Sequence, residues 1–472
     1  MSKNLVIVES PAKAKTIKKY LGKDFEVMAS YGHVRDLVPK EGAVDPTRQF
    51  AMRWELIDKN KKHVDAIARA VKKADALYLS TDPDREGEAI SWHLFELLKD
   101  SGALDGKAVH RSVFYEITRN AVQEAVDHPR EIAEELVKAY LARRALDYLV
   151  GFNLSPLLWK KAGLSGASAG RVQSPALRMI CEREEEILAF VPREYWTVEA
   201  DAEKAAQPFA AKLIEFGGEK VEQFTITDGA RAEQVRRALE TAAGGTLTVA
   251  SVEKKQRKRN PSPPFTTSTL QQEASRKLGF GAQRTMRTAQ RLYEGVDFGE
   301  GPVGLITYMR TDSVSLAGEA IADIRRAIAG IYGAEAVPAS PRQYRTKSKN
   351  AQEAHEAIRP TSASRTPEQL AGKLDPDQHR LYTLIWRRAV ASQMEAAVFD
   401  TVAVDLSAGT GNTFRANGST LVSPGFLAVY RESFDDVTLD DEDDRRLPAL
   451  ETGDRVKLLA IKPEQHFTEP PP

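Results

Sequence analysis

Short apolar runs and amphipathic stretches alternate along the first 130 residues of the chain. The apolar runs are rich in aliphatic and β-branched residues and predict buried strands at 5–8, 25–29, 77–80 and 109–114. Apolar positions at helical spacing predict helices at 10–20, 58–73, 86–99 and 118–126, the first with a Ser-Pro start. Because strands and helices take turns, this part predicts an α/β domain with a mostly parallel sheet.

The remaining sequence changes its pattern several times. Residues 131–192 predict helices at 131–147 and 178–188, on either side of a Gly-, Ser- and Ala-rich stretch at 163–170. Residues 195–252 and the sequence from 399 onward alternate as strands do, apart from one helix expected near 230–242, whereas residues 265–395 are mainly helical with a few strands. We therefore expect one β-rich domain made of two separated segments, with the helical region inserted between them. Residues 254–264 are basic and proline-rich and indicate a linker.

Composition and charge narrow the class of protein. The 472 residues suffice for about three domains. Sixty-seven basic and 67 acidic residues cancel, which speaks against a uniformly basic nucleic-acid binder. The charge is nevertheless uneven, since residues 251–291 hold ten basic and two acidic side chains, while residues 431–446 hold eight acidic ones. Each of these segments could also be an ordinary solvated surface.

The single cysteine and the N-terminus indicate the compartment. Cys181 cannot form an intramolecular disulfide or a cysteine-rich zinc site, and its apolar neighbours predict a buried position in a helix. No apolar run approaches the ~18 residues of a membrane span. The N-terminus becomes charged too early for a signal peptide. We expect a cytoplasmic protein that does not associate with membranes.

A cluster of carboxylates follows the predicted strand at 77–80. Asp82 and Asp84 alternate out of the strand end, Glu86 lies one turn further, and Glu9 ends the first strand. Ligands bind at the carboxyl ends of strands in open α/β sheets, and carboxylate oxygens suit Mg²⁺. Helix capping explains one carboxylate well and three poorly, although for Glu9 alone it is an equal alternative. The sequence has no phosphate-binding loop of the P-loop type, which speaks against an ATPase of that class.

Several longer motifs occur in a fixed order along the chain. They are residues 8–17 (VESPAKAKTI), 30–37 (SYGHVRDL), 82–90 (DPDREGEAI), 168–174 (SAGRVQS), 304–313 (GLITYMRTDS) and 354–360 (AHEAIRP). The first three resemble a Toprim domain, and the whole series resembles the bacterial topoisomerase I branch of the type IA DNA topoisomerases. The resemblance implies a toroidal architecture made of a Toprim domain (1–130), the first part of a helical gate domain (131–192), a β-rich arch (193–262 and 396–472) and an inserted tyrosine domain (263–395).

The resemblance also implies a reaction and roles for particular residues. A tyrosine, matched here by Tyr308, attacks a DNA phosphodiester, forms a 5′-phosphotyrosyl bond and releases a 3′-hydroxyl, without ATP. Lys13 matches a lysine beside the scissile phosphate, and Glu9 matches a residue that handles the 3′-oxygen proton and contacts the metal. Glu9, Asp82, Asp84 and Glu86 would form the Mg²⁺ site. Arg310 lies two residues after Tyr308, so in an extended segment both side chains share a face and the guanidinium can stabilise the same phosphate.

Further positions match DNA contacts of the family. They are His33, Arg143, Arg144, Asp147, Phe152, Trp159, Ser168, Ala169, Gly170, Arg171, Val172, Gln173 and His355. Arginines can bind phosphates and aromatic rings can stack on single-stranded bases, although core packing explains Phe152 and Trp159 equally well. The expected partner is single-stranded DNA within negatively supercoiled duplex, and the expected protein is a monomer at the bacterial nucleoid.

The family pattern continues beyond the motifs present here. We therefore expect a core fragment without the C-terminal modules, without zinc, and with weak or absent relaxation of plasmid DNA. Three other interpretations stay open at this stage: a topoisomerase III-like decatenase, a Toprim nuclease or primase, and a DNA-binding module without catalysis. A nuclease or primase would use the acidic cluster without Tyr308.

Overall fold

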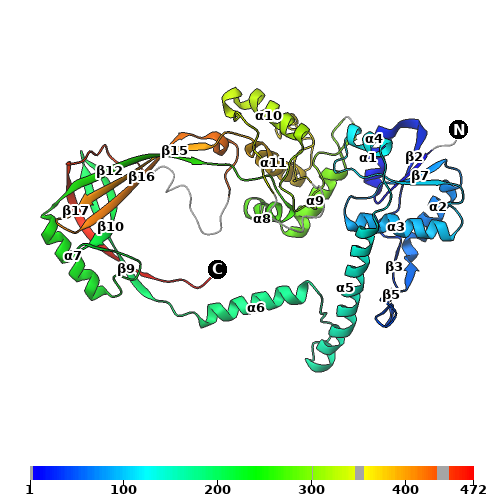
Figure 1. Ribbon diagram of the computed structural model, residues 1–472, viewed down its shortest axis with the longest axis horizontal. Coiled ribbons are helices and arrows are strands. Elements are labelled where there is room, and N and C mark those ends of the chain that lie inside the picture. The colour runs from blue at the N-terminus through cyan, green and yellow to red at the C-terminus, as the bar shows by residue number, and fades with distance from the viewer. Residues whose placement is uncertain (1–3, 300, 346–355, 433–445) are drawn as a thin grey trace. The chain divides into compact units, whose positions relative to one another are not determined.

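The computed structural model describes residues 4–299, 301–345, 356–432 and 446–472. The chain separates into two units (Figure 1). The first, here called the site unit, contains Met1–Pro175, Ser262–Met394 and Val429–Ser433. The second, here called the β unit, contains Ala176–Pro261, Glu395–Ala428 and Phe434–Pro472. The four predicted domains divide the chain more finely than these two units and stay a prediction.

A four-stranded parallel sheet forms the N-terminal part of the site unit. Its strand order is β2 (Phe25–Ala29), β1 (Asn4–Val8), β7 (Ala76–Leu79) and β8 (Ala108–Arg111). The helices between them are α1 (Pro11–Leu21), α2 (Lys61–Val71), α3 (Arg85–Asp100) and α4 (Arg119–Asp127), with single 3₁₀ turns at Gly22–Asp24 and Asp58–Asn60. The predicted α/β pattern is confirmed, although β8 ends three residues before the predicted boundary. Its core contains Leu5, Ile7, Ile67, Leu77 and Leu94.

Side-chain capping explains where three of these four helices begin. The Ser10 side chain accepts a hydrogen bond from the Lys13 backbone N–H, and Pro11 occupies the first helical turn of α1. Thr118 caps α4 in the same way. Four very short strands between β2 and α2 were not predicted: β3 (Arg35–Leu37) pairs with β6 (Trp54–Leu56), and β4 (Val44–Asp45) pairs with β5 (Ala51–Met52). Strands of two or three residues are too short for a recognisable alternation.

Two helices follow the α/β part. Helix α5 (Glu134–Lys161) is longer than predicted, and α6 (Gln173–Ala189) has no buried residue. The prediction that Cys181 is buried is wrong, because its thiol is exposed. The apolar side chains of Leu177, Ile180 and Leu188 on the same helix are 62%, 66% and 77% exposed. Their pattern indicated a packed helix, but no described segment covers them.

The region with the predicted nucleophile completes the site unit. It contains α8 (Thr267–Leu278), α9 (Ala282–Glu294), the short hairpin β13 (Val296–Asp297) and β14 (Pro302–Val303), α10 (Gly318–Tyr332), a 3₁₀ turn at Ala334–Ala336, and α11 (Pro376–Ala391). Helix α9 packs against α8 and α11 and also touches α1 of the α/β part. Buried apolar residues of this region include Phe265, Leu270, Phe280, Leu292 and Ile385.

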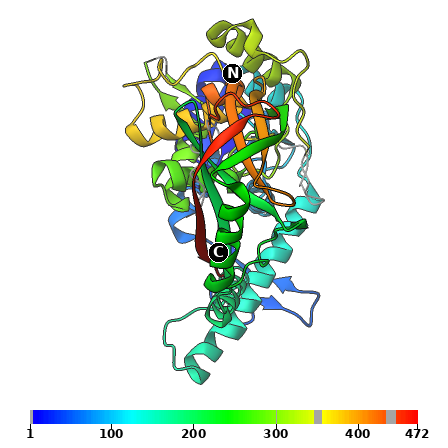
Figure 2. The same cartoon turned by 90° about the vertical axis from the view of Figure 1, so that its left-hand side faces the viewer.

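The β unit is one antiparallel sheet whose strands come from two distant segments (Figure 2). The strand order is β11 (Glu219–Lys220), β10 (Gln207–Phe216), β16 (Thr413–Ser423), β15 (Ala397–Ser407), β12 (Thr246–Arg259), β17 (Arg455–Phe467) and β9 (Glu194–Lys204). Strand β10 also pairs with β9, so the sheet closes on itself. Helix α7 (Gly229–Ala243) packs against β17 and β9, and a 3₁₀ turn lies at Gly425–Ala428.

The predicted linker at 254–264 is wrong over its first half. Residues Lys254 to Arg259 belong to β12 and pair in register with β15, from Lys254 opposite Val402 to Arg259 opposite Ala397. Most of these side chains are exposed, so backbone pairing and not burial forms the strand. None of the helices in the described ranges is long and apolar enough to cross a membrane.

Candidate active site

Lys13 lies at the centre of a buried ion cluster. Its Nζ atom is 2.7 Å from Glu9 Oε1 and 2.6 Å from Asp82 Oδ1, and its side chain is inaccessible to solvent. Glu9 follows β1 and Asp82 follows β7, two adjacent parallel strands whose carboxyl ends share one sheet edge. The rings of Phe114 and Tyr293 flank the ammonium group, with centroids 5.3 and 5.4 Å away.

Burial changes the protonation of this cluster. Burial raises the pKa of Glu9 to about 8, the negative charge of Asp82 acts in the same direction, and the nearby Lys13 opposes both. Burial alone would lower the pKa of Lys13, but Asp82 and Glu9 outweigh burial and the pKa is raised. Lys13 is therefore a fixed cation, whereas Glu9 can carry or release a proton near neutral pH. The second carboxylate oxygen of Glu9, Oε2, is buried and has no hydrogen-bond partner.

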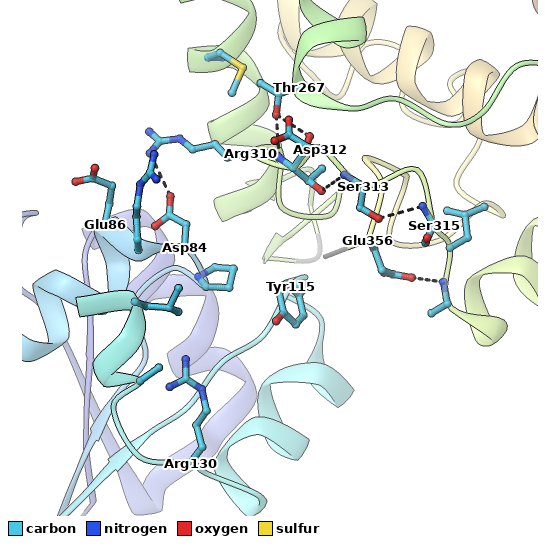
Figure 3. A pocket seen from close by; sticks show the side chains of 18 of the residues that line it. Asp84, Glu86, Tyr115, Arg130, Thr267, Arg310, Asp312, Ser313, Ser315 and Glu356 are labelled. Atoms are coloured by element: carbon cyan, nitrogen blue, oxygen red, sulfur yellow. Dashed lines mark hydrogen bonds and ion pairs between the residues drawn. The ribbon is translucent and has the colours of Figure 1, made fainter. Parts of the chain in front are cut away.

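Asp84 connects the acidic loop to the predicted nucleophile. Its Oδ1 accepts a hydrogen bond of 2.9 Å from the Gly87 backbone N–H and thereby caps α3. Its Oδ2 accepts a hydrogen bond of 2.7 Å from the Tyr308 hydroxyl and lies 3.5 Å from Arg310 Nη1. Figure 3 shows Arg310 and Asp84 facing each other across this contact. The helix cap and the site contact are thus made by the two oxygens of one carboxylate.

Tyr308 is almost fully buried in this arrangement. Its side chain lies edge-on to Tyr293 at a centroid distance of 5.3 Å, and its backbone N–H donates to the Tyr115 carbonyl oxygen at 2.8 Å. Burial raises the pKa of the Tyr308 hydroxyl far above its usual value, the charges of Asp82 and Asp84 add to this rise, and Arg310 opposes it. The hydroxyl is therefore a neutral donor here and must transfer its proton before or during any attack on phosphorus.

Glu86 has a different partner from the other acidic residues. Its Oε2 lies 3.3 Å from His33 Nε2, and this contact with His33 lowers the pKa of the Glu86 carboxyl below its ordinary value. The His33 ring stacks on Tyr140 with a centroid distance of 5.7 Å. No group of three or more His, Cys, Asp or Glu residues is gathered as a ready metal site within the described ranges. Instead, each predicted metal ligand contacts another partner. Glu9 and Asp82 pair with Lys13, Asp84 contacts Tyr308 and Arg310, and Glu86 contacts His33.

The remaining predicted DNA contacts lie on α5, from Arg143 to Trp159, and on the loop after it. Arg144 pairs with Asp36 at 2.7 Å, and Asp147 pairs with Arg171 at 2.7 Å and with Arg143 at 3.7 Å. Phe152 is half-exposed and stacks on Tyr148.

Backbone contacts shape the loop after α5. Trp159 donates its indole N–H to the Ala167 carbonyl, the Gln173 amide donates to the Ser168 carbonyl, and the Ala169 N–H donates to Ser155. The Gly170 N–H donates to Ser174, and Val172 is exposed. His355 lies outside the described residues.

Arg111 and Glu88, whose roles were not predicted from the sequence, hold the Asp82 loop from behind. The fully buried Arg111 donates hydrogen bonds to the carbonyl oxygens of Leu79, Thr81 and Asp82 at 3.0, 2.9 and 2.7 Å. Glu88 compensates its charge at 3.0 Å and also binds Arg130 at 2.8 Å. Arg111 ends a strand and has no recognisable motif around it. Only its acidic partner Glu88 lies in a motif, DPDREGE, that marked this region as functional.

Gly87 is required by close packing in the same loop. A Cβ atom at this position would lie 2.1 Å from the Asp82 carbonyl oxygen, well inside van der Waals contact. The glycine therefore allows the start of α3 to approach the acidic loop. This approach brings Asp84 to the position in which it caps the helix and contacts Tyr308.

The segment with Tyr308 is anchored directly on the α/β part. Thr16 Oγ1 donates to the Glu294 carbonyl oxygen at 2.8 Å, and Arg359 Nη2 donates to Glu116 Oε2 at 2.8 Å. Arg359 also pairs with Glu356 on its own segment at 2.6 Å. These contacts hold the nucleophile against the acidic loop.

Two cavities open beside Asp84 and Arg310. The first, of about 1050 Å³, is also lined by Arg85, Arg130 and Arg143 on one part and by Thr267, Asp312, Ser313, Ser315 and Glu356 on the other (Figure 3). The second, of about 700 Å³, is also lined by Glu9, His33 and Asp82 and by one face of α9. Asp84, Glu86, Met286 and Arg310 line both cavities. Asp84, the carboxylate that accepts the hydrogen bond of the buried Tyr308, therefore lies where the two cavities meet.

Comparison with known proteins places this site in a family. Residues 131–472 match the family model described as DNA topoisomerase, and residues 4–117 match that of the Toprim domain. The chain belongs to the DNA topoisomerase family and has the type IA fold, as the motifs predicted.

Individual relatives agree with the family. The chain is 62% identical to DNA topoisomerase 1 of Xylella fastidiosa strain 9a5c, covering 100% of this chain and 58% of that protein. It is 52% identical to DNA topoisomerase 1 of Rickettsia felis, covering 99% of this chain and 60% of that protein. The structure of full-length topoisomerase I from Thermotoga maritima matches with a TM-score of 0.82 and 36% identity, over 99% of this chain and 73% of that one. The chain thus spans about three-fifths of the curated relatives it matches.

Proposed function

We propose that the protein carries out the strand cleavage and religation of a type IA DNA topoisomerase, the reaction by which such enzymes relax negatively supercoiled DNA without ATP. One observation carries the proposal: the Tyr308 hydroxyl lies 2.7 Å from Asp84, with Arg310 on the same carboxylate and the Lys13 cluster next to it. A buried tyrosine with an acceptor for its proton and a cation for the phosphate has the parts that nucleophilic attack on a phosphodiester requires.

The proposed cleavage step balances its protons within these residues. Tyr308 Oη attacks the phosphorus atom and transfers its proton to Asp84, which already accepts a hydrogen bond from it. The bond between phosphorus and the 3′-oxygen breaks, and the 3′-oxygen takes the proton held by Glu9. The products are a 5′-phosphotyrosyl bond and a 3′-hydroxyl. Religation is the reverse, since the 3′-hydroxyl returns its proton to Glu9 as it attacks, and Tyr308 recovers its proton from Asp84.

Three further groups support this reaction. Arg310 is more than half exposed and can reach a phosphate bound above Tyr308, where its guanidinium would stabilise the added negative charge. Lys13 holds Glu9 and Asp82 together. Glu9 is protonated near neutral pH because its pKa is about 8, and it is therefore suited to act as the acid.

The acidic residues fit a magnesium ion as cofactor. Asp82, Asp84 and Glu86 supply oxygen donors, and the buried Glu9 Oε2 has no hydrogen-bond partner. Mg²⁺ usually keeps several waters and needs only one or two carboxylates together with substrate phosphates, so a preassembled cage is unnecessary. When bound, the ion would neutralise the charge between these carboxylates and the phosphate and help to align the two DNA ends for religation.

The DNA partner follows from the same proposal. His33, Arg143, Arg144, the loop at 168–173 and His355 would bind the single-stranded region, with Phe152 and Trp159 available for stacking on bases. The four segments named from the motifs would serve as the Toprim, gate, arch and tyrosine domains. The protein would act as a monomer on nucleoid DNA in the bacterial cytoplasm.

Trapping of the covalent adduct tests the proposal. A single-stranded oligonucleotide labelled at its 3′ end is incubated with the protein, denatured and separated by gel electrophoresis. A 5′-phosphotyrosyl bond leaves the label on the wild-type protein and not on Tyr308→Phe. Tyr332→Phe on α10, outside both cavities, serves as the matched control. Cleavage that survives in Tyr308→Phe without an adduct would favour a Toprim nuclease, and absence of any adduct in the wild type would reject the proposal.

A further inference from the structure

The second cavity has walls of opposite charge. One wall is formed by Glu9, Asp82, Asp84 and Glu86 of the α/β part. A second wall is one face of α9 with Gln283, Arg287, Gln290 and Arg291, of which Gln290 is partly buried and donates a hydrogen bond of 2.9 Å to Glu294 Oε1. None of these four α9 residues belongs to the motifs or to the predicted DNA contacts. This face therefore has no role in the function proposed above.

The α9 side chains form a continuous stripe. Positions 283, 287, 290 and 291 are spaced by four, seven and eight residues from the first, which places them on one helix face. The opposite face is buried through Thr285, Ala289 and Leu292. Arg287 has no carboxylate partner within the described ranges, and Arg291 has only a distant one, Asp375 at 4.0 Å. These two cations are therefore available to a ligand that enters the cavity.

Arg284 of the same helix is different. Its guanidinium makes two hydrogen bonds of 2.7 Å to Asp377, and it does not line the cavity. The arginines of α9 are thus divided into one that binds α11 and two that face the acidic loop. Substitution of Arg284 changes the same charge on the same helix and provides a matched control.

The charge distribution selects both the ligand and its position. A strand of nucleic acid carries a negative charge at every phosphate, so it is repelled by the carboxylate wall and attracted to the arginine wall. Glutamine amides and arginines donate hydrogen bonds to phosphate oxygens without reading sequence. Because Asp84, Met286 and Arg310 line both cavities, a strand that lies over Tyr308 passes from the first cavity into the second.

We propose that Arg287 and Arg291, with Gln283 and Gln290, bind backbone phosphates of the scissile strand on the side of Tyr308 away from Arg143. The inference rests on the proposed function and adds to it a second site for the scissile strand. One arm of the strand then lies in the first cavity with Arg130 and Arg143, and the other arm lies along α9. The two arms together hold the scissile phosphate over Tyr308 and Arg310.

Three oligonucleotides with one common cleavage site test this inference. One extends on both sides of the site, and each of the others is shortened to a single nucleotide on one side. Binding and adduct yield are measured for the wild type, Arg287→Ala/Arg291→Ala and Arg284→Ala. The double variant should bind the long oligonucleotide about tenfold more weakly, as expected for loss of a charge-assisted contact. Its slope of log affinity against log salt should fall by about 1.4, or ~0.7 per phosphate contact.

The decisive result is whether the effect of the double variant depends on which side of the cleavage site the oligonucleotide extends. The double variant should impair the long oligonucleotide and one shortened form, and leave the other shortened form unchanged, because that form lacks the arm along α9. Arg284→Ala should behave as the wild type. Equal impairment of all three oligonucleotides, or of none, would overturn the inference. Thermal unfolding shows whether each variant is folded. An adduct in the wild type keeps the proposed function in place even if this inference fails.

Discussion

The protonation of Glu9 gives the sharpest test of the proposed proton transfers. Burial beside Asp82 raises the pKa of Glu9 to about 8, so the carboxyl is protonated at neutral pH and ionised above pH 8. Cleavage needs the protonated form, which donates to the 3′-oxygen, whereas religation needs the ionised form, which accepts from the 3′-hydroxyl. The two half-reactions should therefore depend on pH in opposite directions.

The size of the effect follows from the same pKa. At pH 9 only about one Glu9 in ten is protonated, so the cleavage rate should be about tenfold lower than on the acidic plateau. At pH 7 about one in ten is ionised, so religation should be slower by the same factor relative to its alkaline plateau. Glu9→Gln keeps the shape of the side chain but cannot exchange the proton, and should lower both rates by about 10²–10⁴-fold.

Single-turnover cleavage and salt-induced religation, each measured from pH 6 to pH 10, provide the assay. In the wild type both profiles should bend near pH 8, one falling and the other rising with pH. In Glu9→Gln both bends should disappear, while Glu134→Gln at the exposed start of α5 should retain them. A bend near pH 8 that persists in Glu9→Gln would refute the assignment of the proton to this residue.

Three further perturbations have expected outcomes. Lys13→Met leaves Glu9 and Asp82 buried without their cation and should lower the free energy of unfolding by about 3–5 kcal/mol in urea titrations. Substitution of the exposed Lys18 on the same helix by Met should change that free energy by less than about 0.5 kcal/mol. Equal effects of the two substitutions would contradict the structural role of the cluster. Gly87→Ala forces a Cβ against the Asp82 carbonyl and should cost about 1–3 kcal/mol, whereas Gly151→Ala in open space on α5 should stabilise the helix slightly. Chelation of Mg²⁺ should let the trapped adduct accumulate and stop its religation until the metal is restored; religation at an undiminished rate in chelator would contradict a magnesium role in that step.

The α/β part was predictable because the apolar runs of its strands and the helically spaced apolar positions of its helices occupy separate stretches of the sequence. Strands β1 and β7 are short apolar runs, and three of the four helices begin at a side-chain cap: Ser10, Asp84 or Thr118. The carboxylates were predictable for the same reason, since Glu9 and Asp82 each follow a strand of one parallel sheet. The predicted strand ends were enough to predict that these two carboxylates lie close together.

Other features depend on contacts that a local pattern does not contain. Residues 254–259 form a strand because β15 pairs with their backbone, although their side chains have the composition of a linker. Cys181 is exposed because no described segment packs on its helix, although its neighbours are apolar. Lys13 was expected beside the phosphate, yet it is fully buried between two carboxylates, which only the tertiary arrangement reveals. Arg111 supports the acidic loop from a strand end that has no distinctive sequence.

The central claim is that Tyr308 forms the covalent bond to DNA, and peptide mapping of the trapped adduct tests it most directly. Trypsin should release the nucleotide on the peptide 292–310, which contains both Tyr293 and Tyr308. Because the two rings lie 5.3 Å apart, fragmentation of that peptide is needed to assign the modified residue. The account predicts a nucleotide on Tyr308 and an unmodified Tyr293. A nucleotide on Tyr293, on any other residue, or on none would contradict it.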